Sequence, residues 1–87
     1  MSHARTRAIV TGHSRGLGAG IARALLERGV KVLGVSRRTA SAPEGVPAGL
    51  LEEQALDLAD PAALSDWLAA GGLERFLADA ELALLVN

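Results

Sequence analysis

The chain has 87 residues, a formal net charge of −1 and no cysteine. This length suffices for one small domain, and the absence of cysteine excludes disulfides, thiolate metal sites and cysteine nucleophiles. The near-zero charge argues against a nucleic-acid partner or a membrane surface, no apolar run approaches the ~20 residues of a membrane span, and no secretory signal is recognisable, so we expect a cytoplasmic location.

The first half of the chain alternates apolar runs with a helical pattern. Residues 7–11 are apolar and β-branched, which is typical of a buried strand. Residues 16–28 repeat apolar side chains at three- and four-residue steps before Gly29, which predicts an amphipathic helix. Residues 31–36 form a second apolar run. Two strands joined by a helix predict a right-handed βαβ unit with a parallel sheet.

The middle of the chain is rich in residues that interrupt regular structure. Residues 37–53 contain two prolines and several small polar residues, so we expect a loop there, with at most a helical turn at 49–53. A third strand is predicted at 53–58. The loop leaves no full helix between the second and third strands.

The last part of the chain predicts two short helices and a strand. Asp60 is suited to cap a helix over 61–70, because a proline follows it at the first helical position. Two glycines end that helix, a second helix is predicted at 73–79, and the apolar run at 81–87 predicts a fourth strand. Together the elements predict an α/β fold, a partial Rossmann-type parallel sheet of about four strands with flanking helices.

Three glycines, Gly12, Gly16 and Gly18, lie between the first predicted strand and the first predicted helix. Gly12 lets the chain turn sharply, and the first helical turn points unpaired backbone N–H groups at whatever lies above the sheet edge. A pyrophosphate suits that place, with Gly16 allowing its close approach and Gly18 allowing tight packing. A P-loop is excluded because no Gly-Lys-Ser/Thr follows. The alternative is a glycine-rich turn without a ligand.

Four short segments resemble the motifs of the short-chain dehydrogenases/reductases, in the order found in that family. They are TGHSRGLG at 11–18, VSRR at 35–38, LDLAD at 56–60 and LLVN at 84–87. The resemblance implies that residues 1–87 are the N-terminal part of an NAD(P)-binding Rossmann domain, in an oxidoreductase with a carbonyl or alcohol substrate and a homo-oligomeric assembly. It also implies cofactor contacts, from Gly12, Ser14, Arg15 and Leu17 to the phosphates and ribose, from Asp57 and Leu58 to the adenine, and from Asn87 to the adenosine ribose.

The residues after the second predicted strand favour NADP over NAD as the cofactor. An NAD site has a carboxylate there that accepts from the ribose 2′-OH, whereas this chain has Ser36, Arg37 and Arg38. A guanidinium binds a 2′-phosphate bidentately, and Arg15 could reach the same phosphate from the other side. The alternative is that Arg37 and Arg38 are solvated loop residues.

The chain carries none of the residues that the family uses for hydride transfer, which are a serine, a tyrosine and a lysine four residues after the tyrosine. It has no tyrosine, and its only lysine, Lys31, opens the second predicted strand. We therefore predict an NADP(H)-dependent dehydrogenase/reductase represented by its dinucleotide-binding segment, without catalytic residues and inactive alone. The alternative is a non-catalytic dinucleotide-binding or redox-sensing module.

Polar side chains outside these motifs have no predicted chemical role. We expect His13 to face solvent, and we expect Glu27, Glu52 and Glu53 to lie on solvated faces. No cluster has metal-ligand spacing, so no metal is expected.

Overall fold

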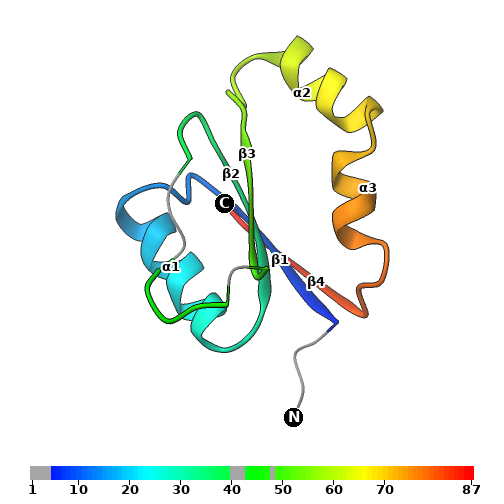
Figure 1. The fold of residues 1–87 in the computed structure, drawn as a ribbon. Helices are drawn as coiled ribbons and strands as arrows, with labels where there is room; N and C mark the ends of the chain where they lie inside the picture. The colour runs from blue at the N-terminus through cyan, green and yellow to red at the C-terminus, as the bar shows by residue number, and fades with distance from the viewer. Residues whose placement is uncertain (1–4, 40–42, 48) are drawn as a thin grey trace.

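The computed structural model describes residues 5–39, 43–47 and 49–87, and these form one four-stranded sheet with three helices (Figure 1). In chain order the elements are β1 (Thr6–Thr11), α1 (Gly16–Glu27), β2 (Lys31–Ser36), β3 (Leu51–Ala55), α2 (Pro61–Ala69), α3 (Gly72–Leu77) and β4 (Leu82–Val86). All neighbouring strands pair in parallel, in the order β3-β2-β1-β4. The predicted partial Rossmann-type sheet with flanking helices is therefore confirmed.

Helix α1 covers one face of the sheet through a small aliphatic core. Buried side chains of α1, β1, β2 and the turn between α1 and β2 meet there: Ala8, Val10, Ala22, Leu26, Val30 and Val32. The helix ends at Glu27, one residue before its predicted end, and Gly29 follows with a φ of +81° that other residues rarely take.

Helices α2 and α3 cover the opposite face. The core on this side consists of Leu33, Val35, Leu56 and Phe76, with Trp67 packed against it. Burial of a side chain such as Phe76 contributes roughly 1.5–3 kcal/mol to the folded state. The cap of α2 is as predicted, since the carboxylate of Asp60 accepts from the backbone N–H groups of Ala62 and Ala63.

The third strand is shifted toward the N-terminus relative to its predicted range of 53–58. Its register is set by pairing with β2, in which Val32 lies opposite Leu51 and Ser36 lies opposite Ala55. Because β2 ends at Ser36, no residue of β2 lies opposite the residues after Ala55, and the chain turns there. The helical turn expected at 49–53 is wrong, because residues 51–53 already belong to β3. Residues 40–42 and 48 of the predicted loop lie outside the described residues.

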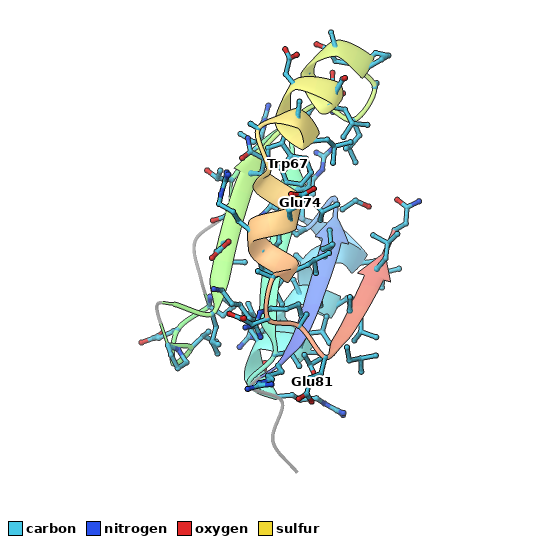
Figure 2. All side chains as sticks on the ribbon, turned by 90° about the vertical axis from the view of Figure 1, so that its right-hand side faces the viewer. Trp67, Glu74 and Glu81 are labelled. Atoms are coloured by element: carbon cyan, nitrogen blue, oxygen red, sulfur yellow. The ribbon has the colours of Figure 1, made fainter. Side chains whose placement is uncertain are left out.

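Strand β4 pairs only with β1 among the described strands, and its side chains are largely exposed. Leu82 is 53% exposed and Leu85 is 72% exposed, and these two side chains lie on opposite faces of the sheet. Figure 2 shows β4, the red arrow, at the edge of the sheet with no helix in front of it.

Candidate functional site

The loop between β1 and α1 has the conformation that its glycines predict. Gly12 and Gly16 adopt φ values of +69° and +62°, in the left-handed region. A Cβ atom on Gly18 would collide with the carbonyl oxygen of Gly12, so only glycine permits this close approach between the helix and the loop. The side chain of Arg15, the N-cap residue of α1, makes no capping hydrogen bond. The first amides of α1 thus remain available to an acceptor outside the helix.

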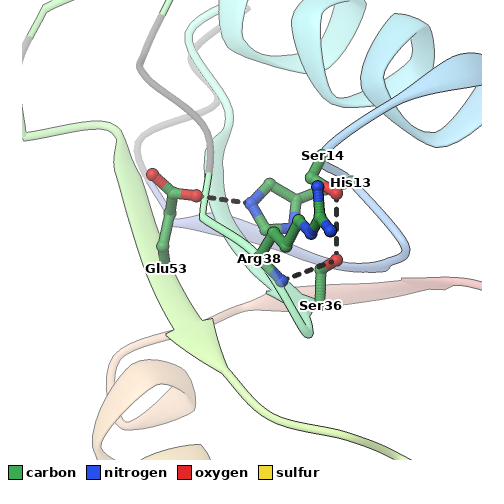
Figure 3. A network of polar contacts seen from close by, with 5 residues as sticks. All are labelled: His13, Ser14, Ser36, Arg38 and Glu53. Carbon is green, nitrogen blue, oxygen red and sulfur yellow. Dashed lines mark hydrogen bonds and ion pairs between the residues drawn. The ribbon is translucent and has the colours of Figure 1, made fainter.

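Two hydrogen bonds attach this loop to the end of β2. The N–H of Gly12 donates to the carbonyl oxygen of Val35 at 2.8 Å. The hydroxyl groups of Ser14 and Ser36 lie 3.0 Å apart, which brings the first two predicted motifs together (Figure 3).

Two adjoining pockets open at the carboxyl ends of β1, β2 and β3. The first, of about 480 Å³, is lined by Ser14, Arg15, Ser36, Arg37, Arg38 and Thr39. The second, of about 270 Å³, shares Ser14, Arg15, Ser36 and Arg37 with the first and adds Gly12, Val35, Leu56, Asp57, Leu58 and Ala59. Ligands of open α/β sheets bind at this end of the strands. The fold thus gathers residues of three predicted motifs around two adjoining pockets.

The first pocket combines three guanidinium groups with hydroxyl groups. Arg15, Arg37 and Arg38 are exposed, and among the described residues none of the three pairs with a carboxylate. The residues that line this pocket include no acid. Such a lining suits an anion with several oxygen acceptors, because each guanidinium can donate two parallel hydrogen bonds.

The other predicted site residues divide into two groups. Asp57 and Leu58 line the second pocket, where the carboxylate of Asp57 accepts from the N–H of Ala59 at 2.9 Å and Leu58 is 43% exposed. Leu17 and Asn87 line neither pocket. Asn87 lies at the same end of the sheet, and its side-chain oxygen accepts from the hydroxyl group of Thr11 at 2.7 Å.

The prediction that His13 and Glu53 are exposed to solvent is wrong. The side chain of His13 is only 2% exposed, and its Nε2 lies 2.6 Å from a carboxylate oxygen of Glu53, whose side chain is 18% exposed. A Cβ atom on Gly34 would overlap the His13 ring, so the ring occupies the space that a side chain on β2 would otherwise fill. Gly34, a glycine inside a buried strand, is the sequence feature that indicates a close approach of another group to β2. Glu27 and Glu52, in contrast, are about half exposed and pair with Arg23 and Lys31.

The described residues show neither a metal-binding cluster nor a membrane-spanning helix. No group of three or more His, Cys, Asp or Glu side chains among them could hold a metal ion. No helix in this part of the chain is long and apolar enough to cross a membrane.

Comparisons with known proteins agree with this geometry. The model of the NAD dependent epimerase/dehydratase family matches residues 8–77. A "Probable oxidoreductase" of Streptomyces antibioticus is 39% identical over 88 residues, covering 91% of this chain and 30% of that protein. The crystal structure of a short-chain dehydrogenase/reductase from Burkholderia vietnamiensis matches with a TM-score of 0.88 and 48% identity, covering 97% of this chain and 39% of that one. The chain therefore belongs to the NAD-dependent epimerase/dehydratase family, which is of the short-chain dehydrogenase/reductase type.

Proposed function

We propose that this chain is the N-terminal dinucleotide-binding part of an NADP(H)-dependent oxidoreductase of the carbonyl reductase or alcohol dehydrogenase type. The observation that carries the proposal is the pocket lined by Arg15, Arg37 and Arg38 at the carboxyl ends of β1 and β2, without an acid. Membership of a family with a nicotinamide dinucleotide cofactor supports it. So does the name of the Streptomyces relative, "Probable oxidoreductase".

The residues around the two pockets fit the adenosine half of such a cofactor. The free amides at the start of α1 would hold the pyrophosphate beside Gly12 and Gly16, because a helix N-terminus favours anions. Asp57 would accept from the adenine amino group, and Leu58 would support the ring. Asn87 would contact the adenosine ribose. These roles are what the motifs of the family imply for the corresponding positions.

The 2′-phosphate of NADP would account for a pocket that is lined by three arginines and no carboxylate. In an NAD site an acid after the second strand accepts from the ribose hydroxyl, and the same acid would repel a phosphate. Here Ser36 stands at that place, at the end of β2. Arg37 and Arg38 would bind the phosphate from one side and Arg15 from the other.

The chain's own residues bind and orient the cofactor, whose nicotinamide ring supplies or accepts the hydride in this class of enzyme. The sequence holds no tyrosine. Lys31 opens β2, at the end of the strand opposite the pockets, and its ammonium group pairs with Glu52 at 3.0 Å. The proposal therefore places the acid that protonates the substrate oxygen in residues outside this chain, and the carbonyl or alcohol substrate would bind there.

The test is the preference between NADPH and NADH, measured by calorimetric titration and by melting temperature. We expect NADPH to bind more tightly, and a hundredfold excess over its dissociation constant stabilises the folded protein by ~2.7 kcal/mol. The double variant Ser36→Asp with Arg37→Ala should weaken NADPH by about a hundredfold, because it replaces a cation by an anion beside the phosphate.

The matched control is Arg28→Ala. Arg28 is an exposed arginine at the other end of α1, and it lines neither pocket. Its removal should leave the preference between the two cofactors unchanged. Equal NADPH affinity in the wild-type protein and the double variant would refute the assignment of NADP.

A further inference from the structure

The imidazole of His13 is buried beside the pockets but lines neither of them. It lies on the face of the sheet that α1 covers, over Gly34, and β-sheet pairing places Gly34 directly opposite Glu53. The side chain of His13, which comes from the loop between β1 and α1, thus packs over a glycine of β2 and contacts a carboxylate of β3. Figure 3 shows its contact with Glu53.

Three consecutive loop residues are held by three different contacts. Gly12 donates to the carbonyl oxygen of Val35, and Ser14 pairs with Ser36, so both of these contacts reach β2. The contact of His13 reaches β3. A carboxylate that accepts a hydrogen bond at 2.6 Å from a buried ring nitrogen makes a strong contact, because charge and low exposure both strengthen it.

Contacts to the sheet restrain this loop because the glycines in it restrict the backbone little. Gly12 and Gly16 flank the segment that carries Ser14 and Arg15, and glycine is the residue with the largest conformational freedom. Without an anchor, the free loop would have to be ordered when a ligand binds, and that ordering would reduce the affinity.

We propose that His13 and Glu53 are positioning residues for the dinucleotide. Their hydrogen bond fixes Ser14 and Arg15 opposite Ser36, Arg37 and Arg38, at the separation that lets both walls of the pocket bind one 2′-phosphate. The proposal rests on the proposed function, and it assigns a role to two residues that line neither pocket.

The test compares two ligands that differ by this phosphate alone. Purified protein is titrated with adenosine 2′,5′-bisphosphate and with 5′-AMP, and the ratio of the two dissociation constants is recorded. An unfolded fraction lowers both apparent affinities by the same factor, so a residue that only stabilises the fold leaves the ratio unchanged. Glu53→Ala should lower the advantage of the bisphosphate by about tenfold, since a hydrogen bond to a charged group is lost.

Three further variants sharpen the test. Glu53→Gln should restore most of the ratio, because its amide can still bond the imidazole. His13→Phe should behave like Glu53→Ala, since it keeps a ring over Gly34 but loses the hydrogen bond. Glu52→Ala should retain the wild-type ratio, because this residue neighbours Glu53 on β3 but points to the opposite face and pairs with Lys31.

The outcomes separate the two proposals. A wild-type protein that binds both ligands equally overturns the NADP assignment and this inference with it. A wild-type preference for the bisphosphate that persists in Glu53→Ala and His13→Phe overturns the positioning role alone. A preference lost in those two variants and kept in Glu53→Gln and Glu52→Ala supports it.

Discussion

Strands β2 and β4 are both short apolar segments, yet their surroundings in the sheet are opposite. Four of the six residues of β2 are buried, whereas four of the five residues of β4 are exposed. The difference comes from their neighbours. β2 lies between β1 and β3 with a helix layer on each face, while β4 pairs with β1 alone among the described strands. An apolar run therefore predicts a strand, but its position in the sheet decides how much apolar surface it buries.

The largest expected effect is on the free energy of unfolding, when a carboxylate is placed in β2 and, for comparison, in β4. Val32 in β2 is 0% exposed and Leu85 in β4 is 72% exposed. Val32→Asp should lower the free energy of unfolding by more than about 4 kcal/mol, because it buries a carboxylate without a partner. Leu85→Asp should change it by less than about 0.5 kcal/mol. Urea unfolding followed by circular dichroism checks both values, and similar losses would contradict the contrast between the strands.

A smaller effect concerns self-association through the exposed strand. An apolar edge is prone to pair with another chain, so we expect the 87-residue chain to dimerise or aggregate in solution. Replacing both Leu82 and Leu85 by lysine should weaken this association by at least about tenfold, because charged edge strands resist pairing. Sedimentation velocity measures it. A monodisperse wild-type monomer that unfolds cooperatively would show that the exposed β4 does not cause self-association.

The smallest expected effect lies at the end of β4. Asn87→Ala removes the acceptor of the 2.7 Å hydrogen bond from Thr11 and a proposed contact to the adenosine ribose. It should weaken NADPH and NADH by the same factor, between about twofold and tenfold, because both cofactors contain that ribose. Titration with both cofactors gives the two factors. Unequal losses would mean that the end of β4 contributes to the choice between them, which we assign to the end of β2.

Most of the fold follows from local sequence signals, and the deviations have physical causes. The range of β2 was predicted without error, and those of β1, α1, α2, α3 and β4 to within two residues, because glycine, proline and the capping Asp60 mark their ends. The range of β3 was less accurate. Its bounds depend on pairing with β2, and no residue near position 51 indicates in the sequence where this pairing begins.

The candidate site was predictable where motifs are short and local. Ser14, Arg15, Ser36, Arg37 and Asp57 do converge on adjoining pockets. The partnership of His13 with Glu53 could not be read in this way, because 40 residues separate the two side chains. Only the sheet register brings them together, and a histidine in a glycine-rich loop is polar enough to suggest exposure.

The missing side chain at Gly34 couples positions 13 and 34 through the volume of the His13 ring, and the hydrogen bond of that ring adds Glu53 as a third position. Any larger residue there would expel the His13 ring, and a small residue at position 13 would leave a hole over β2. Positions 13, 34 and 53 should therefore vary together between related sequences. A protein engineer who grafts this loop onto another Rossmann sheet would have to transplant all three residues at once.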